Sequence, residues 1–327
     1  MADMFRIFII LLFAIASLPV VATPKTFLTP NTVLEIESIE VAKNIYVVHG
    51  INQSPTPENK GLIANLGFVV NDSGVIVIES GASQKHGGLL VKAIEKTTSL
   101  PIIAVFNTHQ HGDHWLGNNA IRKRFPAAKF YANKTMVETA QSTVGDDWVT
   151  LLNSLTDGAI TGTQPFPPSY PLANNDILNF GNVTIKIHSN DAAHTGTDII
   201  VSIEQNSTKH AVFLGDVGLH QRIGRMDDGN FKGNIEALDN AITLQADVYV
   251  PGHGPTTLGS SSAQLYRDYL SLLYEQTERW YEEGLTDFEI KDKIRPAFKQ
   301  WEHWEGFNEE FGRHVSLIYL EIEEASF

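Results

Sequence analysis

The sequence predicts an α/β fold, and three features of the chain support this. Short apolar runs bounded by Gly, Asn and Asp are typical of strands, and they alternate with stretches of helical spacing. A length of 327 residues allows a sizeable core, and 43% hydrophobic with 19% charged residues is typical of a soluble globular protein. Ligand-type side chains follow several predicted strands, which is where α/β folds usually place their sites.

The first half of the chain is predicted to start with strands and to continue as strand, helix and strand. Strands are expected across 44–50, 64–72 and 74–81, with the turn "NDSG" between the last two. A helix is expected across 85–96, where apolar residues recur at helical spacing. The runs "PIIAVFNT" and "AKFYAN" are then expected as strands on either side of a helix in "LGNNAIRKRF".

The segment 145–176 is Pro-rich and shows no periodicity, so it is predicted to be an ordered connection or lid rather than a strand. A second β-rich half follows. Its expected strands are "VTIKIHS", "TDIIVSIE" and "HAVFLGD", then, after a helix near 235–244, "ADVYVPGHG". Both halves share hairpins followed by strand, helix and strand, although no sequence repeat is visible.

The chain is predicted to be helical from Ser261 onward. The first of these helices should end at Gly284, and "TDFE" has the capping-box spacing that opens another helix. A last helix should end near Phe327. Because no domain-sized linker appears, we expect residues 23–327 to form one domain that includes this helical segment.

The N-terminus predicts a removable signal peptide over residues 1–22. A start carrying Arg6 precedes an apolar run, and small residues follow near Ala22. A membrane anchor is the alternative, but an uncleaved span needs ~20 apolar residues. This run is shorter, and Ser17 and Pro19 interrupt it. We therefore expect a periplasmic or secreted protein with no stable membrane insertion after signal removal.

Charge and cysteine content narrow the range of partners and of metal ligands. The formal charge of −14 argues against a nucleic-acid partner, because phosphate binding depends on clustered Lys and Arg. A small-molecule substrate is expected instead, and the oligomeric state stays open. The chain has no cysteine, so a metal site would have to use His, Asp or Glu.

The stretch "FNTHQHGDHWLGN" crowds ligand-type side chains into one loop after a predicted strand. His109 and His111 can converge on one metal, and Asp113 and His114 can reach a second, with Gly112 allowing a tight backbone path. A solvated His-rich turn is the alternative, but four such residues after a strand favour metal binding. Zinc suits imidazole and carboxylate ligands, with iron and manganese as alternatives. Further candidate ligands stand at other strand ends: His194, Asp216 and His253.

This ordered set of residues resembles that of the metallo-β-lactamase-fold hydrolases, and the resemblance runs through most of the chain. It implies a four-layer αββα sandwich with a two-metal site at one edge of the sheets. His109, His111 and His194 would hold the first metal. The second would be held by Asp113, His114 and His253, with Asp216 bridging the two ions.

Two further roles are expected, one from the resemblance and one from the chemistry of a metal-bound water. Glu79 matches a position where this superfamily often places a carboxylate that orients a ligand histidine, and a plain solvated strand end is the alternative. Asp113 is the candidate for accepting or steering a proton during catalysis. The string from "VAKNIYVVHG" to "VIESGAS" also resembles exported hydrolases associated with quinoprotein and sulfur-oxidation systems.

The expected function is hydrolysis of a small ester, lactone, thioester or cyclic amide by a metal-bound hydroxide. Aspartate at the bridging position resembles the glyoxalase-like and lactonase-like members. Zinc β-lactamase-type activity and a non-catalytic metal-binding protein are the alternatives. A hydroxyacylglutathione hydrolase is less favoured, because no basic glutathione-binding residues can be placed. Substrate choice should lie in loops, where Arg222 and Arg225 either meet a substrate carboxylate or are surface charges.

Overall fold

The fold is described from a computed structural model of the chain, which covers residues 36–189, 192–205 and 208–326. The expected signal peptide at 1–22 lies outside these residues. The described residues fall within one compact unit, Val33–Phe327. Among them, no helix is both long and apolar enough to cross a membrane.

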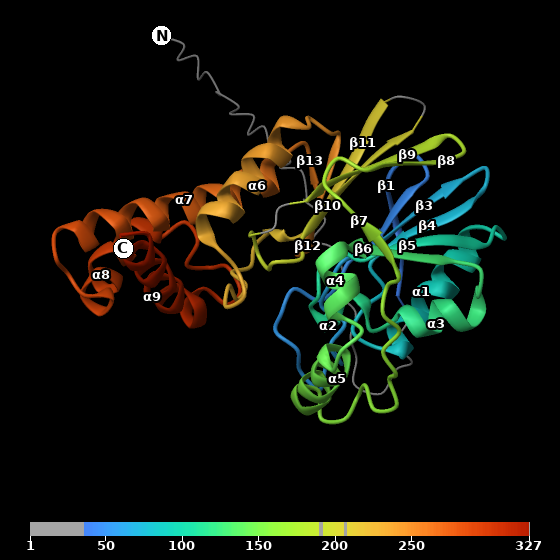
Figure 1. Cartoon of the computed structure of the whole chain (residues 1–327), viewed down its shortest axis with the longest axis horizontal. Helices are drawn as coiled ribbons and strands as arrows, with labels where there is room; N and C mark the ends of the chain where they lie inside the picture. Colours follow the sequence, from blue (N-terminus) through green and yellow to red (C-terminus); the bar gives the residue numbers. More distant parts are fainter. Residues whose placement is uncertain (1–35, 190–191, 206–207, 327) are drawn as a thin grey trace, which may run out of the picture. The chain divides into compact units, whose positions relative to one another are not determined.

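The first sheet has seven strands that run in chain order, from β1 to β7 (Figure 1). Neighbours are antiparallel up to β4, and β4 to β7 are parallel. The strands expected in the first half are all present. The bounds are β1 Ile39–Ala42, β2 Ile45–Val48, β3 Leu66–Asn71, β4 Gly74–Ile78, β5 Ile102–Phe106, β6 Lys129–Asn133 and β7 Tyr170–Leu172.

The second sheet has six strands in the order β13-β12-β11-β10-β9-β8, coloured yellow-green to orange in Figure 1. Among the described strands of this sheet, β11 and β12 pair in parallel and the other neighbours pair antiparallel, so each half of the chain combines antiparallel hairpins with a parallel crossover, as expected. The bounds are β8 Ile177–Phe180, β9 Val183–Ser189, β10 Ile199–Gln205, β11 Thr208–Leu219, β12 Val248–His253 and β13 Thr257–Leu258.

The helices lie largely where helical spacing predicts them. The expected helix at 85–96 is α1, with Ser83 as its N-cap, and the one near 235–244 is α6. The bounds are α1 Gln84–Thr97, α2 Gly112–Trp115, α3 Asn118–Arg124, α4 Lys134–Thr139, α5 Val144–Leu155, α6 Phe231–Thr243, α7 Ser261–Glu282, α8 Asp287–Ile294, the 3₁₀ helix η1 Arg295–Phe298 and α9 Phe307–Ala325.

The alternation of side chains along the strands builds four layers. In β4, Ile76 and Ile78 pack between the sheets, whereas Val75 and Val77 pack against α1 and α3 on the outer face. In β10, Val201 packs between the sheets, while Ile200 packs with apolar residues of α6 and α7 on the outer face. Two sheets packed face to face with helices outside them form an αββα sandwich, which confirms the expected fold class.

The expectation for 145–176 was wrong for two parts of this segment. Residues 144–155 form α5, and Tyr170–Leu172 form β7 at the edge of the first sheet. Asp146 and Asp147 lie in the first turn of α5, where carboxylates favour a helix. The Pro-rich composition of the rest obscured both elements. Pro171 is tolerated in β7 because it lies on an edge strand.

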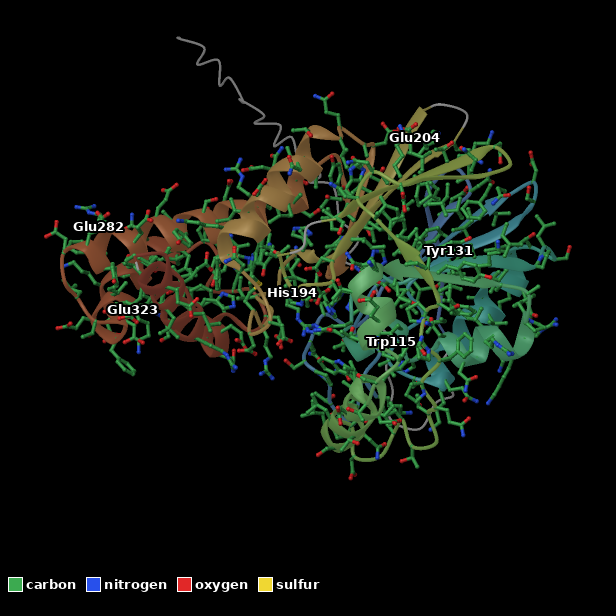
Figure 2. All side chains as sticks on the ribbon, in the orientation of Figure 1. Trp115, Tyr131, His194, Glu204, Glu282 and Glu323 are labelled. Atoms are coloured by element: carbon green, nitrogen blue, oxygen red, sulfur yellow. The ribbon has the colours of Figure 1, made fainter. Side chains whose placement is uncertain are left out.

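The helical segment formed by α7, α8, η1 and α9 packs on the outer face of the second sheet and has a mainly apolar core. Its Glu282 and Glu323 are exposed, as Figure 2 shows. Gly284 follows α7 with a φ of +82°, and a capping box opens α8 at Thr286, so both sequence signals are confirmed. The buried aromatic residues of this core include Tyr269, Phe298, Trp301, Phe307 and Phe311.

Candidate metal centre

Most of the predicted site residues lie at strand ends or in the loops that follow them. Asp216 was expected at a strand end but lies within β11, because this strand continues past it to Leu219. The stretch from His109 to His114 follows β5, and its last two candidate ligands fall in the short helix α2. His194 precedes β10, and His253 ends β12. β5 and β12 lie in different sheets, and each runs parallel to a neighbour. Both sheets therefore place ligand residues at the carboxyl end of a parallel strand, where α/β folds build sites.

Two glycines allow the ligand loops their close approach. A Cβ on Gly112 would lie 2.6 Å from Cβ of Trp148, so a side chain there would displace α5. Gly215 has a φ of +53° where the register of β11 with β12 shifts, which turns the chain immediately before Asp216. The tight path expected at Gly112 is therefore imposed by packing against a tryptophan.

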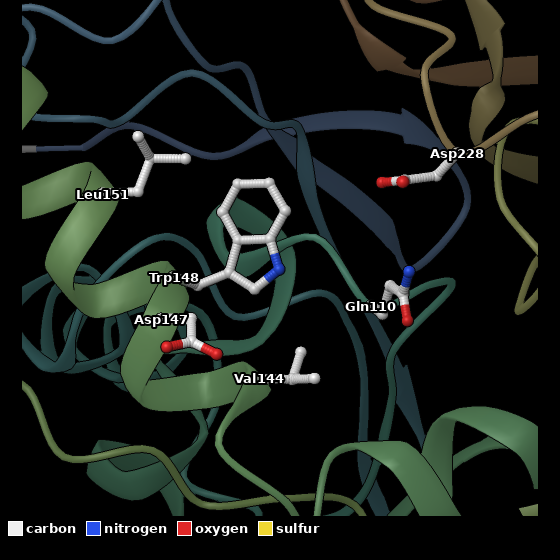
Figure 3. A pocket seen from close by; sticks show the side chains of 6 residues that line it. All are labelled: Gln110, Val144, Asp147, Trp148, Leu151 and Asp228. Atoms are coloured by element: carbon white, nitrogen blue, oxygen red, sulfur yellow. The ribbon is translucent and has the colours of Figure 1, made fainter.

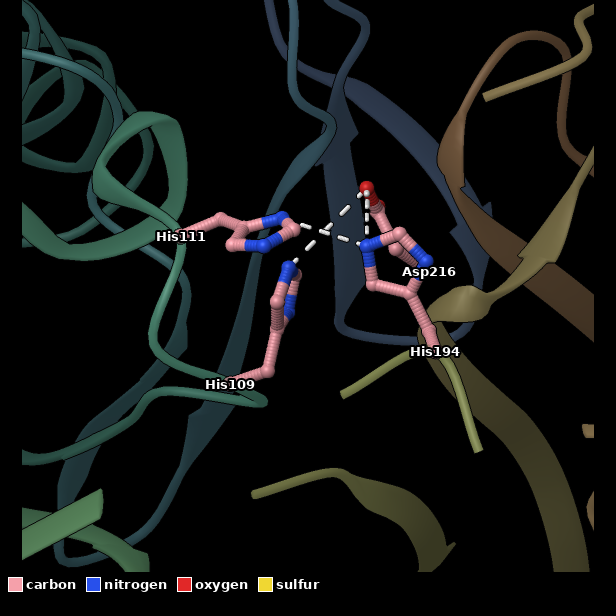
Figure 4. Close-up of side chains that lie close together, drawn as sticks. All are labelled: His109, His111, His194 and Asp216. Atoms are coloured by element: carbon pink, nitrogen blue, oxygen red, sulfur yellow. Dashed lines mark hydrogen bonds and ion pairs between the residues drawn. The ribbon is translucent and has the colours of Figure 1, made fainter. Parts of the chain in front are cut away.

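A first group of ligand atoms is formed by His109, His111, His194 and Asp216 (Figure 4). Nε2 of His194 lies 3.1 Å from Nδ1 of His111. Oδ2 of Asp216 lies 3.6 Å from Nε2 of His194 and 3.9 Å from Nε2 of His109. These four atoms could hold one metal ion.

A second group is formed by Asp113, His114 and His253. Oδ2 of Asp113 lies 3.3 Å from Nε2 of His253 and 3.6 Å from Nε2 of His114. Asp216 approaches this group as well, with Oδ1 3.3 Å from Nε2 of His114 and Oδ2 3.2 Å from Nε2 of His253. Its carboxylate therefore lies between the two groups, which is the position required of a bridging ligand.

Glu79 lies on the far side of His114 from these ligand atoms. Its Oε1 is 3.1 Å from Nδ1 of His114, and it accepts hydrogen bonds from the backbone N–H and the hydroxyl of Thr108. Glu79, His109 and His114 also form a third close group. However, Nδ1 of His109 contacts the Thr108 hydroxyl at 3.0 Å, so Thr108 stands between Glu79 and His109. Glu79 contacts the outward nitrogen of His114 directly and orients that ring.

The protonation states of the buried side chains in this cluster suit a divalent cation. Burial, reinforced by the neighbouring histidines, holds the pKa of His109 well below its ordinary value, and burial lowers that of His194 to about 3. These imidazoles are therefore neutral, as metal ligands must be. Burial opposes ionisation of Asp216, but positive charge on the rings of His253 and His114 outweighs burial and holds the pKa of this carboxyl well below its usual range. A divalent cation held by neutral rings would supply that positive charge in place of the two protons.

Unpartnered buried atoms give a test of whether the residues fit a metal. Within the described part of the chain, Nε2 of His109, Nε2 of His114 and Oδ1 of Asp216 have no hydrogen-bond partner. Buried polar atoms are normally paired, and these three face the interior of the cluster. The residues therefore fit metal ions of the kind that imidazole and carboxylate bind, such as zinc.

Sequence reasoning missed several residues that hold the ligand loops. Asn65 is buried and donates to the carbonyls of Pro251 and Gly254 at 2.8 Å each, which fixes the loop around His253. The Thr197 hydroxyl accepts from the backbone N–H of Gln110 at 3.1 Å and so joins the loop after His194 to the first motif. No local pattern marks such residues, because their partners are distant in sequence.

Two other histidines and the two arginines of the substrate loops lie outside the three groups of candidate ligands. His188 contacts the Ser202 hydroxyl at 2.9 Å, and His49 contacts that of Thr256 at 2.8 Å. Arg222 donates to the Gln53 carbonyl, and Arg225 pairs with Asp227 at 2.6 Å. The two arginines are thus engaged within the protein.

The chain belongs to the Metallo-beta-lactamase superfamily, whose family model matches residues 59–253, more than half of the chain. A linear primary-alkylsulfatase of Pseudomonas sp. is 21% identical over 68% of this chain and 48% of its own length. A probable metallo-hydrolase of Streptococcus pyogenes is 25% identical over 59% of this chain and 80% of its own length.

Two solved structures share the fold. The sec-alkylsulfatase of Pseudomonas sp. has a TM-score of 0.67 at 16% identity, over 88% of this chain and 50% of its own. The metallo-beta-lactamase of Hirschia baltica has a TM-score of 0.52 at 16% identity, over 72% of this chain and 98% of its own. This chain thus spans about half the length of both alkylsulfatases.

Proposed function

We propose that the protein is a hydrolase that uses two divalent ions, most simply zinc, to cleave a small ester, lactone, thioester or cyclic amide. The position of the Asp216 carboxylate between two groups of histidines carries this proposal. When bound, two such ions activate a water molecule and polarise the carbonyl under attack. Membership of the superfamily supports a hydrolase, and the clustered histidine and aspartate side chains supply candidate metal ligands.

The protein side chains divide the remaining work. Burial raises the pKa of Asp113, but the charges of His114 and His253 outweigh burial and keep this carboxyl ionised. An ionised Asp113 can accept the proton of the attacking water and return it to the leaving oxygen, sulfur or nitrogen, so that water adds across the cleaved bond. Glu79 holds the ring of His114 in the orientation that turns Nε2 towards the cluster.

Hydrolysis of an alkyl sulfate ester is a second candidate. The fold likeness to the sec-alkylsulfatase covers 88% of this chain, more than the 72% shared with the Hirschia baltica enzyme. The linear primary-alkylsulfatase also matches 68% of the chain. A sulfate group offers oxygen atoms that divalent ions can bind, so the same cluster could serve this reaction.

A substrate panel with controlled metal content tests the proposal. The full-length protein is assayed on esters, lactones, thioesters, β-lactams and a linear alkyl sulfate, before and after dialysis against a strong chelator. We expect turnover of at least one carbonyl substrate, its loss on chelation and its return with zinc. Turnover of the sulfate alone would favour the second candidate. Unchanged turnover in the metal-free protein would refute the mechanism, and no turnover with both ions bound would indicate a metal-binding protein.

We also propose that the protein is exported to the periplasm or secreted, as a soluble protein that acts on small molecules and not on nucleic acid. The apolar run before residue 23 and the charge of −14 support this. N-terminal sequencing of protein from a periplasmic extract should find a start near Thr23. Intact Met1 on membrane-bound material would contradict it.

A further inference from the structure

A pocket of about 260 Å³ opens beside the candidate metal centre (Figure 3). Its wall on one side is the helix α5, and on the other side it meets the first ligand motif at Gln110 and the loop that carries Asp228. An apolar cavity of about 150 Å³ can hold benzene, so this pocket has room for a ring or a short alkyl chain. Its lining residues are Gln110, Val144, Asp147, Trp148, Leu151 and Asp228.

Two contacts join this pocket to the metal centre through His111. The ring of Trp148 lies against the His111 ring, with the centroids 4.9 Å apart. Oδ2 of Asp228 lies 3.4 Å from Nε2 of His111, whose Nδ1 faces the cluster. A group in the pocket would therefore lie directly beside one of the proposed metal ligands, as the non-reacting part of a substrate would.

The walls of the pocket favour an apolar group. Val144, Trp148 and Leu151 are spaced by four and three residues, so they share one face of α5. The side chain of Leu151 remains 42% exposed, which leaves apolar surface in contact with water until a ligand covers it.

The charges of the pocket disfavour an anionic group. Two of the six lining residues are the carboxylates Asp147 and Asp228, and none of the six is Lys or Arg. The neighbouring Arg225 is paired with Asp227. An anionic substituent, such as the carboxylates of a glutathione conjugate, would meet negative charge here without a compensating cation.

We infer that the α5 pocket binds an uncharged apolar part of the substrate, an aryl or short alkyl group, while the hydrolysed bond lies at the metal centre. This inference rests on the proposed function for the identity of the reaction, but the binding itself does not require turnover. Leu151 and Trp148 provide the contact surface, and Asp147 excludes anions.

Binding is tested first without any reaction. The indole N–H signal of Trp148 is assigned in the NMR spectrum by comparison with the Trp148→Phe protein. It is then followed in the full-length, metal-loaded protein as 2-phenylethanol is added. We expect this signal to shift, and Leu151→Asn to weaken the apparent affinity about tenfold, since it removes apolar contact area. Leu155→Asn is the matched control, because Leu155 is 44% exposed on the same helix but does not line the pocket.

Selectivity is tested with two esters of one alcohol, a 3-phenylpropionyl ester and a succinyl ester, which carry a ring or a carboxylate at the far end of the acyl group. We expect a higher kcat/KM for the phenylpropionyl ester. Asp147→Lys should raise kcat/KM for the succinyl ester about threefold or more by replacing repulsion with attraction. Asp146→Lys is its control, because Asp146 lies in the same helical turn but outside the pocket lining.

The outcomes separate the pocket from the reaction. A shift of the Trp148 signal that Leu151→Asn weakens and Leu155→Asn does not supports the pocket, even if the protein hydrolyses nothing and the proposed function fails. No shift, or equal effects of the two leucine substitutions, would overturn the inference even if esters are hydrolysed. So would a preference for the succinyl ester in the unmodified protein.

Discussion

The candidate metal centre and the helical segment α7–α9 both contain buried histidines, but the ring nitrogens of these histidines have different partners in the two regions. His314 in α9 has partners for both ring nitrogens, the Tyr269 hydroxyl at 3.2 Å and the Gly224 carbonyl at 2.9 Å. In the metal centre, His114 and His253 each have their outer nitrogen bound, to Glu79 and to the Ile63 carbonyl. Their inner nitrogens face one another and Asp216.

This difference shows which property of a buried histidine indicates a metal ligand. Burial alone does not, because His314 is as buried as His109. The indication is a second ring nitrogen that faces other ligand atoms without a hydrogen-bond partner, as Nε2 of His109 and of His114 do within the described residues. In the helical segment the protein itself supplies both bonds to the His314 ring, whereas in the candidate metal centre the protein leaves the Nε2 atoms of His109 and His114 without a hydrogen-bond partner among the described residues.

The largest expected effect is on Asp216→Ala. If Asp216 bridges two ions as proposed, loss of its carboxylate should reduce bound metal from about two ions towards one. Three histidines would still serve the first ion, while repulsion between the ions would rise. Turnover of the active substrate should fall at least about a hundredfold. Elemental analysis of dialysed protein and steady-state kinetics are the measurements.

The control for this substitution is Asp247→Ala, since Asp247 is an exposed carboxylate that pairs with His210, outside the candidate metal centre. It should keep both ions and full turnover. Equal metal content and similar turnover in Asp216→Ala and the unmodified protein would mean that Asp216 does not bridge.

Metal removal should destabilise the protein. Free zinc at about a hundred times its Kd should add about 2.7 kcal/mol to the free energy of unfolding, because only the folded chain brings the ligands together. Urea unfolding with and without zinc measures this gain. The His314→Gln protein should gain the same stability from zinc, because His314 lies in the helical segment and substitutions at distant sites act additively. Zinc that leaves the urea midpoint unchanged would contradict the assignment of a metal centre.

Glu79→Gln should weaken the second ion about 10–100-fold, because the amide keeps the shape of the side chain but loses the charge that orients and polarises His114. Competition with a chelating dye measures this affinity. Glu95→Gln, which alters an exposed pair with Arg124, is the control and should change nothing. If the two variants bind metal alike, Glu79 is only a strand-end carboxylate.

His314→Gln is expected to have the smallest effect. At pH 7 it should cost about 2 kcal/mol, because it leaves a buried partner atom unpaired. Burial lowers the pKa of His314 to about 4 in the folded protein. As pH falls below about 6.5, His314 therefore becomes protonated in the unfolded chain before it does so in the folded protein. The unmodified protein therefore loses stability between these pH values, about 1.4 kcal/mol from this group at pH 5.5.

Urea unfolding at pH 7 and pH 5.5 measures both parts of this prediction. At pH 7 the His314→Gln variant should have a lower free energy of unfolding than the unmodified protein. On acidification to pH 5.5 it should lose less stability, because the contribution of His314 is absent. An identical pH dependence in the two proteins would show that His314 does not titrate as its burial requires.

The sequence determined the elements with strong periodicity and the identity of the clustered residues. Helix α1 and the strands β4, β9 and β12 appear where alternation or helical spacing predicts them, because local patterning fixes which face is apolar. The seven candidate ligands were identified from type, order and strand-end position. The structure brings all of them together, while their role as ligands stays a prediction.

Other features were decided only by the tertiary structure. Helix α5 lies in a segment whose prolines obscured its pattern, and the contact of Trp148 with His111 joins residues 37 positions apart. Asn65 and Thr197 hold ligand loops through hydrogen bonds to partners far away in the chain. Such contacts depend on how the two sheets pack, and a one-dimensional pattern carries only local preferences. The sequence therefore determined which residues form the cluster, and the packing of the two sheets determined which atoms face its interior.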